Sequence, residues 1–285
     1  MSSQVRVLCV GNIMIDVIAQ LQGDIHFGGD TRAQISTHGG GAAANVATWL
    51  AHIGSVVHLC ARVGRDAYGA SVLAELDSFG VEHSSLIVEG TTGTVIILVT
   101  PDGERTMFPD WAINSTISVS DLPTPLDFTV ALISGYPLID PQSRAQAVKM
   151  LHAIKGAGIP VILDPGTVGA LKEVAPSEIA SWLSHVDALI MNEEEADFLN
   201  SMSSEVPLLI IKKGKDGAVA LQQGLPPVEV EALPSSVIDT TGAGDAFAAG
   251  FIHSWASGLP IRSCLEKGAQ TAAIAVAMVG ARPPR

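Results

Sequence analysis

The chain has 285 residues, of which 47% are hydrophobic and 16% charged, and its formal net charge is −13 at pH 7. This composition excludes intrinsic disorder and is typical of a folded protein with a large apolar core. A negative charge of this size repels phosphate backbones and anionic membrane surfaces, and no cluster of Lys or Arg reverses it locally. We therefore expect neither nucleic acids nor membranes as partners.

The three cysteines, Cys9, Cys60 and Cys264, are widely spaced and lie in apolar stretches. Buried, reduced thiols of this kind indicate a cytoplasmic protein. The amino-terminal residues lead into an apolar stretch without a cleavage-site pattern of small residues, so we expect a first strand there rather than a targeting signal. No window contains the roughly 18 consecutive apolar residues that a membrane helix needs. The last four residues, 282–285, are expected to be frayed.

Short apolar runs bounded by turn residues predict buried strands at residues 5–10, 56–62, 130–134, 161–163, 188–191 and 208–211. Helical patterns lie between several of these runs. One covers residues 67–79, with Asp66 as its N-cap and Gly80 at its end, and another covers residues 142–157. The alternation predicts an α/β fold with a central, mostly parallel sheet flanked by helices. We expect a single domain over residues 1–285.

Two stretches, residues 17–38 and 93–110, interrupt this alternation. In the second, the turn Pro101-Asp102-Gly103 separates two apolar runs, which is a hairpin pattern. Neither stretch has a crossover helix, so we expect both to form a small β-sheet projecting from the main domain. Such a sheet over a cleft predicts a lid, although a solvated edge hairpin fits the same pattern. Its exposed edges suggest a homodimer through the lid as a hypothesis.

The strongest motif is Asp239-Thr240-Thr241-Gly242-Ala243-Gly244-Asp245, which precedes a helical segment at residues 246–255. A glycine-rich turn entering a helix presents unpaired N–H groups and the positive end of the helix dipole, and both bind phosphate. Asp245 could simply cap this helix. The neighbouring glycines leave room for a ligand, however, which favours a functional role. The chain contains neither a P-loop nor a dinucleotide-binding glycine pattern.

A second glycine-rich segment, residues 39–45, opens a helix that extends to Gly54. Its small residues let the backbone approach a ligand closely, and Asn45 can donate and accept hydrogen bonds. A tight helix–sheet contact is the alternative interpretation. Asp16 follows the first strand among apolar residues, where either sugar hydroxyls or a turn could satisfy its carboxylate.

Two polar clusters directly follow buried strands. Asn192 and Glu195 share one face of a starting helix and could hold a hydrated Mg²⁺, although acidic residues also favour any helix start. Residues 212–217 combine glycines and lysines after the next strand, which suits a nucleotide or a plain hairpin. The eight histidines show no metal-ligand spacing.

These motifs resemble the PfkB-type, or ribokinase-like, carbohydrate kinases. Residues 239–245 resemble the carboxyl-terminal signature of that family, and the amino-terminal signature is matched by Gly40-Gly41, Asn45, Ala47, Gly54 and Gly64. Supporting segments cover nearly the whole chain: residues 63–66 with Gly69, 102–106, 163–165, and Asn192 with Glu195. The resemblance implies a Rossmann-like α/β domain with a β-sheet lid. It also implies transfer of the γ-phosphate of ATP to a hydroxyl of a sugar or nucleoside.

The resemblance further implies roles for individual residues. Asp245 would be the general base, and the backbone N–H groups of Gly242, Ala243 and Gly244 would stabilise the transferred phosphoryl group. The acceptor would be bound by Asp16, Gly41, Asn45 and Arg105. The nucleotide would be bound by Asn192, Lys212, Gly214 and Gly217. Glu195 would orient Mg²⁺ through water, and the candidate ligands of K⁺ are Asp239, the Thr241 carbonyl and the loop at Gly280.

Departures from the family pattern concern the acceptor. Ala42 stands where ribokinases usually have a lysine that touches the sugar, and the segment Ser134-Gly135-Tyr136 lacks the glutamate they place there. Ribose is therefore not the expected acceptor. Tyr136 and Trp111 offer aromatic surface that could face a nucleobase or pack the lid. We rank a kinase of an unphosphorylated sugar first, a nucleoside kinase second, and a non-catalytic sugar-sensing relative as a further alternative.

Overall fold

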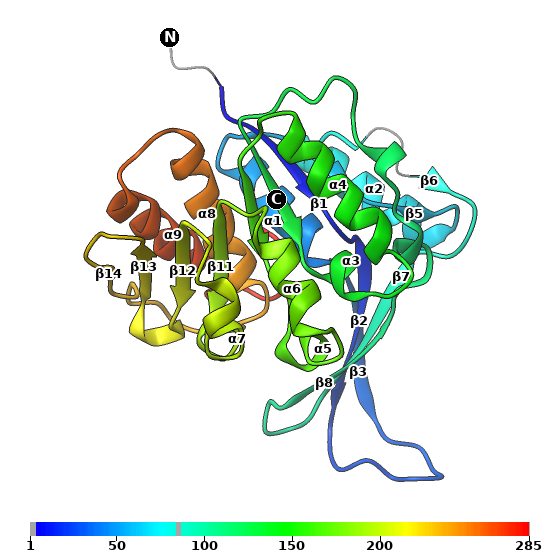
Figure 1. Cartoon of the computed structure of the whole chain (residues 1–285). Coiled ribbons are helices and arrows are strands. Elements are labelled where there is room, and N and C mark those ends of the chain that lie inside the picture. Colours follow the sequence, from blue (N-terminus) through cyan, green and yellow to red (C-terminus); the bar gives the residue numbers. More distant parts are fainter. Residues whose placement is uncertain (1–3, 84–86, 285) are drawn as a thin grey trace.

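The computed structural model describes residues 4–83 and 87–284, and its centre is an eight-stranded sheet with the order β14-β13-β12-β11-β10-β9-β1-β4 (Figure 1). The strands are β1 (Arg6–Val10), β4 (Val56–Cys60), β9 (Val130–Ser134), β10 (Val161–Asp164), β11 (Ala188–Asn192), β12 (Leu208–Lys212), β13 (Ala218–Gln222) and β14 (Val228–Val230). The six strands β12, β11, β10, β9, β1 and β4 pair in parallel with their neighbours. At the other edge of the sheet, β13 pairs antiparallel with β12, and β14 pairs antiparallel with β13. The predicted mostly parallel sheet is confirmed.

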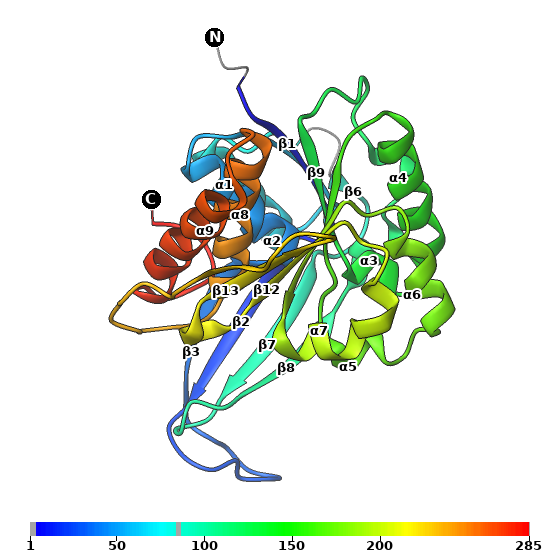
Figure 2. The ribbon, with the colours of Figure 1, turned by 60° about the vertical axis from the view of Figure 1, so that its left-hand side comes forward.

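Helices cover both faces of this sheet, which Figure 2 shows as three layers. One layer contains α1 (Ala42–His52), α2 (Ala67–Phe79), α8 (Ala243–Ala256) and α9 (Ile261–Val276). The other contains α3 (Tyr136–Ile139), α4 (Arg144–Gly156), α5 (Val168–Leu171), α6 (Pro176–Leu183) and α7 (Glu193–Leu199). Single 3-10 turns are η1 (Ala112–Thr116), η2 (Val119–Asp121), η3 (Asn200–Ser203) and η4 (Gly214–Asp216). Within the described residues, no helix combines the length and apolar character needed to cross a membrane.

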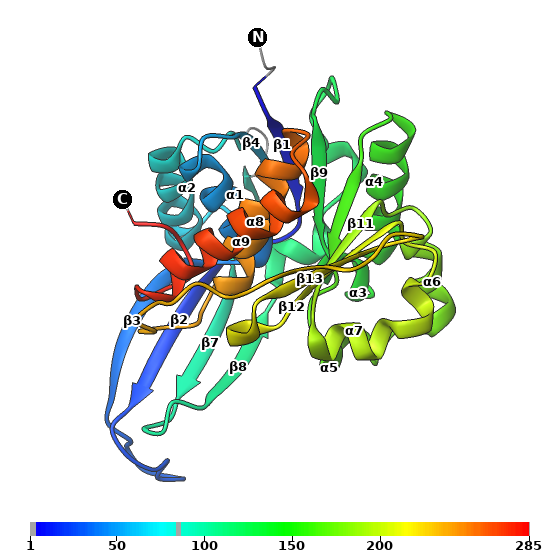
Figure 3. The same cartoon turned by 90° about the vertical axis from the view of Figure 1, so that its left-hand side faces the viewer.

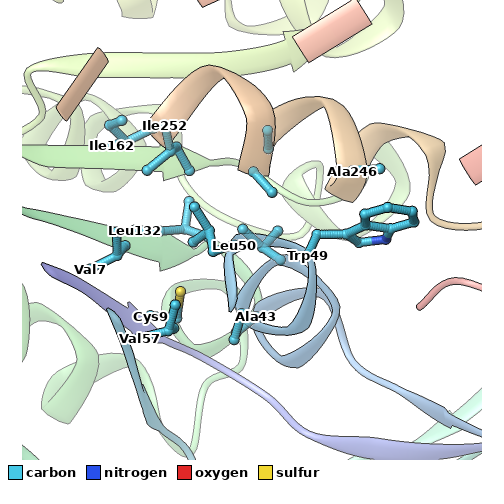
Figure 4. Packing of buried hydrophobic residues seen from close by; sticks show 14 of the residues in the cluster. Val7, Cys9, Ala43, Trp49, Leu50, Val57, Leu132, Ile162, Ala246 and Ile252 are labelled. Carbon is cyan, nitrogen blue, oxygen red and sulfur yellow. The ribbon is translucent and has the colours of Figure 1, made fainter. Parts of the chain in front are cut away.

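The central strands are apolar on both faces because each face packs against a helical layer. In β1, Val7 and Cys9 belong to one core, and Leu8 and Val10 to the other. Figure 4 shows the first core, in which Trp49 of α1 is fully buried. All three cysteines are buried and unbridged. Successive side chains of one strand point into different cores, and both cores are apolar. The sequence therefore shows continuous apolar runs rather than alternating apolar and polar residues.

A second, four-stranded sheet has the order β3-β2-β7-β8 and projects from the main body (Figure 3). Its strands are β2 (Met14–Leu21), β3 (Ala33–Gly40), β7 (Gly93–Val99) and β8 (Arg105–Asp110), and the short pair β5 (Val63–Gly64) and β6 (Ile87–Val88) lies apart from it. The small sheet is present as expected. The first segment of this sheet was expected to cover residues 17–38. The structure extends it at both ends, because β2 begins at Met14 and β3 ends at Gly40, so Asp16 belongs to this sheet.

Element ends differ from the expected ranges in places that affect the site. The helix predicted from residue 246 already begins at Ala243, because Gly242 takes the N-cap position with a φ of 72°. Asp245 therefore lies inside the first helical turn. The carboxyl-terminal residues expected to be frayed include Arg282, which is only 6% exposed because its guanidinium has partners in the protein interior. Residue 285 lies outside the described residues.

Candidate active site

The sequence motifs meet at the carboxyl ends of the parallel strands, next to the N-terminus of α8. Asp164 ends β10 and Lys212 ends β12, and the Lys212 ammonium lies 3.4 Å from the Asp164 carboxylate. A Cβ atom placed on Gly244 would lie 3.3 Å from the same ammonium group. Parallel strands bring residues from distant parts of the chain to one edge, which is where ligands bind in α/β sheets.

Asp245 lies in the first turn of α8 and does not cap the helix. Its carboxylate instead accepts a hydrogen bond of 2.9 Å from the Nδ2 atom of Asn45 on α1. Burial raises the pKa of Asp245 to about 7, and the charges of Asp164 and Asp16 add to this effect against the opposing influence of Asn45 and Lys212. A carboxylate with this pKa can take up a proton near neutral pH, as a general base must.

The turn before Asp245 requires glycine at its N-cap. Gly242 has a positive φ, and a Cβ atom there would lie 2.5 Å from the Cα atom of Ala281. The first N–H groups of a helix have no intrahelical acceptor, so they present donors to an anion. The Ala243 N–H donates a 3.3 Å hydrogen bond to the Thr240 carbonyl. The Gly242–Gly244 turn places the first N–H groups of α8, which are the predicted anion donors, next to Asp245.

Two of the expected acceptor residues, Asp16 and Gly41, lie where the small sheet leads into α1. Asp16 on β2 pairs in register with His38 on β3, and the backbone of Gly40 lies so close to the Asp16 carboxylate that no side chain fits there. Burial raises the pKa of Asp16 to about 6, while Arg282 and His38 lower it. Gly41 has a φ of 92°, and a Cβ atom there would lie 2.6 Å from the carbonyl oxygen of Asn12, so no side chain fits at the start of α1. A carboxylate in this position can accept hydrogen bonds from hydroxyl groups.

Asn45 is buried and engaged at both ends of its amide. Its Nδ2 atom donates to Asp245, and its Oδ1 atom accepts a 3.3 Å hydrogen bond from Nε of Arg282. Sequence reasoning placed Asn45 among the acceptor-binding residues and overlooked Arg282. An arginine near a chain end has no local pattern that predicts burial, so no sequence signal could have identified it.

Arg105 reaches from β8 of the small sheet to the loop before α8. Its guanidinium donates to Asp239 at 2.6 Å and also to the hydroxyl of Thr241. The Asp239 carboxylate further accepts hydrogen bonds from Thr241 and from the Gly280 N–H. Burial opposes ionisation of Asp239, but these hydrogen bonds outweigh it and hold the pKa well below its usual range. The loop and the small sheet are thus joined by an ion pair.

Glu195 and Asn192 form a reciprocal cap at the start of α7. The Asn192 side chain accepts from the Glu195 N–H at 2.8 Å, and both Glu195 oxygens accept hydrogen bonds from Asn192. Burial, followed by the charge of Asp164, raises the pKa of Glu195 to about 7. Burial disfavours the charged form of Lys212, but Asp164, Glu195 and Asp245 together raise its pKa. Three carboxylates therefore surround one lysine.

Asp164 was not among the predicted site residues. The criterion that identified Asn192 and Lys212, a polar residue at the carboxyl end of a buried strand, applies equally to Asp164. The signal was therefore present in the sequence.

A cavity of about 530 Å³ lies between α8, α9 and the loops around β13 and β14. It brings together three predicted nucleotide-binding residues, Lys212, Gly214 and Gly217, with Ala243 and Gly244 of the turn predicted to bind an anion. Asn192 does not line it. The apolar wall comes from Phe247, Ala269, Ala272, Ala273 and Val276. The three alanines of this wall lie on α9 and were not predicted as site residues, because alanines at helical spacing normally indicate helix packing rather than a cavity.

Trp111 and Tyr136 contact each other, with their ring centroids 5.0 Å apart. Both contribute to a small void that also involves Asn12 and Asn114. Asn114 bonds to the N–H and carbonyl of Ile13, at 3.1 and 3.0 Å. The buried Oδ1 atom of Asn12 has no hydrogen-bond partner among the residues that the structure describes. Such an orphaned acceptor is suited to a ligand donor.

Comparisons with known proteins define the class of this α/β enzyme. The model of the pfkB family of carbohydrate kinases matches residues 4–285. The ATP-dependent ribose-1-phosphate kinase of Halopiger xanaduensis is 30% identical over 294 residues, covering 98% of this chain and 94% of the relative. A ribokinase of Arabidopsis thaliana is 28% identical over 269 residues, covering 87% and 69%.

Among solved structures, the adenosine kinase from Sinorhizobium meliloti matches with a TM-score of 0.87 at 24% identity, covering 99% of this chain and 96% of that chain. The protein is a kinase with a ribokinase-like fold. It belongs to the pfkB family of carbohydrate kinases.

Proposed function

We propose that this kinase transfers the γ-phosphate of ATP to a hydroxyl of an unphosphorylated sugar, with Asp245 as the general base. The observation that carries this proposal is the position of Asp245, which directly follows the Gly242–Gly244 turn, is hydrogen-bonded to Asn45 and lies near enough to Asp16 for that charge to raise its pKa. In the step, the acceptor hydroxyl gives its proton to Asp245 and its oxygen bonds to the γ-phosphorus. The bond from that phosphorus to the bridging oxygen breaks, and ADP leaves.

The cavity between α8 and α9 is our candidate for the nucleotide site. Its apolar wall suits a planar base, and its opening toward Gly244 and Lys212 would place the phosphates near the helix start and a cation. The name of the Halopiger xanaduensis relative, an ATP-dependent enzyme, supports ATP as the donor.

The residues present fit a water-coordinated Mg²⁺ better than a directly bound one. No three His, Cys, Asp or Glu residues in the described part of the chain form a metal-binding group. Asp164, Glu195 and Asp245 nevertheless concentrate negative charge around Lys212. Mg²⁺ keeps most of its waters and needs few protein oxygens, so Asp164 and Glu195 could hold it through water. When bound, it would neutralise charge on the phosphates.

The surroundings of the Asp239 carboxylate and the Thr241 carbonyl proposed for K⁺ fit a bound cation poorly. Both oxygens of Asp239 already accept hydrogen bonds from the protein, and the guanidinium of Arg105 supplies a positive charge there. The Thr241 hydroxyl is likewise bonded to Arg105 and Asp239. We derive no step through K⁺.

The arginines near the proposed acceptor site already have partners in the protein, which favours an unphosphorylated acceptor. A substrate phosphate would need a cationic partner near Asp16. Arg105 is paired with Asp239, and Arg282 is bonded to Asn45 and Gly40. The second candidate is a nucleoside, which the Trp111–Tyr136 pair and the orphaned Asn12 oxygen would suit. A non-catalytic sensor is disfavoured, because it would not need a base with a raised pKa.

The test is ADP release from ATP and Mg²⁺ over a panel of pentoses, hexoses, phosphosugars and nucleosides, with Asp245→Asn as the blank. We expect one class of unphosphorylated sugar to stimulate release. The variant should lose at least about 10²-fold in turnover while binding ATP normally, because only the base is removed. A response to nucleosides alone would select the second candidate, and turnover equal to that of the wild type in Asp245→Asn would refute the role of Asp245.

A further inference from the structure

The carboxyl-terminal residues 280–282 contact several parts of the site. The Gly280 N–H donates to Asp239 at 3.0 Å, and the Ala281 carbonyl accepts a 2.9 Å hydrogen bond from the buried indole of Trp49. Ala281 also packs against the backbone of Gly242. This segment is therefore fixed against both the anion-binding turn and α1, which fixes the position of the next residue, Arg282.

The guanidinium of Arg282 is almost fully buried, with 5% of its side chain exposed. It donates through Nε to the Oδ1 atom of Asn45 at 3.3 Å and through Nη2 to the carbonyl of Gly40 at 2.9 Å. Its Nη1 atom is paired with Glu75 on α2. A buried charge needs such partners, and the planar fork of arginine donates from three nitrogen atoms in fixed directions.

These contacts determine which way the Asn45 amide faces. An asparagine amide has an acceptor at one end and donors at the other, and rotation exchanges them. Arginine has donors only, so it selects the Oδ1 end of Asn45. The Nδ2 end must then face Asp245, whose ionised carboxylate only accepts hydrogen bonds. The reversed amide would set oxygen against oxygen at Asp245.

We propose that Arg282 is a positioning residue for phosphoryl transfer, which holds the Asn45 amide so that it donates to Asp245 and holds the Gly40 backbone beside Asp16. The inference rests on the proposed function of Asp245 as the base. Arg282 itself reaches the reaction only through Asn45 and Gly40. Its loss would leave the Oδ1 atom of Asn45 without the Arg282 donor, so Asn45 and the base would be held less firmly while the nucleotide cavity kept its shape.

The kinetic test compares Arg282→Gln and Arg282→Lys with the wild type, at a temperature where circular dichroism shows all of them folded. We expect Arg282→Gln to lower kcat/KM for the acceptor about 10- to 100-fold, the scale of a small misplacement of reacting groups, with KM for ATP nearly unchanged. Arg282→Lys keeps the charge without the fork, so it should recover part of the loss.

Lys155→Gln is the matched control. Lys155 pairs with Asp187 at 2.7 Å, and Asp187 directly precedes β11, so this pair lies at the amino ends of the strands, opposite the site. We expect this variant to lose stability but to keep the kcat/KM of the wild type. Folded Arg282→Gln with unchanged kcat and KM would show that Arg282 is merely structural and would overturn the proposal.

A second measurement is independent of catalysis. In the ¹⁵N spectrum, the Asn45 side-chain amide, assigned by its loss in Asn45→Asp, should exchange its hydrogens at least about 10-fold faster in Arg282→Lys than in the wild type, because exchange follows local opening. Equal exchange rates would refute the positioning role. If the wild type showed no sugar kinase activity but the exchange rates still differed, the proposed activity would be wrong and the positioning of Asn45 by Arg282 would stand.

Discussion

The proposed mechanism depends on Asp245, whose environment makes the ionised form of its carboxylate costly. Its pKa of about 7 lies well above the ordinary aspartate value, because the folded protein buries it near Asp164 and Asp16. The folded state therefore binds this proton more tightly than the unfolded state does. The resulting stability is present at low pH and is lost as the pH rises through about 7.

We therefore predict that Asp245→Asn stabilises the protein above neutral pH. At about pH 8 the wild type must keep a buried charge, whereas the amide is neutral, so the variant should melt at a higher temperature. At about pH 5 the wild-type carboxyl is protonated, and the difference should shrink. Thermal melts of both proteins at the two pH values measure this. A variant less stable at both would contradict the raised pKa.

The same pKa predicts the pH dependence of the reaction. The base must be ionised to accept a proton, so kcat/KM of the wild type should rise about 10-fold per pH unit below the pKa and level off above about pH 7. Asp16, with a pKa of about 6, should make the lower part of the profile steeper. In Asp245→Asn the residual activity should not show the rise in kcat/KM toward pH 7. A wild-type rate that does not change between about pH 5 and pH 8 would exclude Asp245 as the base.

At the scale of elements, the start of α8 depends on a backbone conformation that only glycine adopts easily. In Gly242→Ala the new Cβ atom would meet Ala281 at a positive φ, so either the turn or the carboxyl-terminal segment must move. We expect a loss of stability of about 1–3 kcal/mol and a loss of activity of at least about 10-fold. Denaturant unfolding and ADP release measure the two effects. Gly258→Ala, also at a positive φ but with open space around it, is the control for backbone strain alone.

The ion pair between Arg105 and Asp239 joins the small sheet to the loop before α8. Its Arg105 end is partly exposed, so Arg105→Gln should lower stability by no more than about 1 kcal/mol. The hairpin of β7 and β8 should nevertheless exchange its amide hydrogens faster, because it loses this attachment. Hydrogen exchange with and without acceptor and nucleotide would test the lid. Unchanged exchange in residues 93–110 in every state would argue against lid closure.

At the scale of the whole molecule, the proposed function uses two regions with no residue in common. The cavity between α8 and α9 is the proposed nucleotide site, and the small sheet contributes Asp16 to the proposed acceptor site. The two sites should therefore respond independently to local changes. A substitution in the cavity wall should affect the nucleotide alone.

Ala273→Leu tests this separation. The larger side chain would project into the cavity and take up space that we assign to the nucleotide. We expect KM for ATP to rise at least about 10-fold, because a decrease of about 1.4 kcal/mol in binding free energy weakens affinity tenfold. Acceptor binding measured by calorimetry without nucleotide should stay as in the wild type. Ala180→Leu, at an exposed position of α6, is the control, and an unchanged KM for ATP in Ala273→Leu would place the nucleotide elsewhere.

The local sequence determined the elements of this protein. Apolar runs of five or so residues identified the parallel strands, because both faces of such a strand are buried, and Asp66 and Gly80 identified the ends of α2, because capping depends on neighbouring residues. The turn at residues 239–245 likewise predicted an anion site, which stays a prediction. A strand end or a cap is specified within a few residues, so the chain itself contains the information.

Only the tertiary structure decided how the site residues act on one another. The bond between Asn45 and Asp245 spans 200 positions in the sequence, and the bond from Arg282 to Asn45 spans 237. The raised pKa of Asp245 depends on burial and on charges from other strands. The hydrogen bond from Arg105 to Asp239 depends on where the small sheet places β8. Burial, charge and hydrogen-bond direction arise where distant segments meet, and no local pattern specifies them.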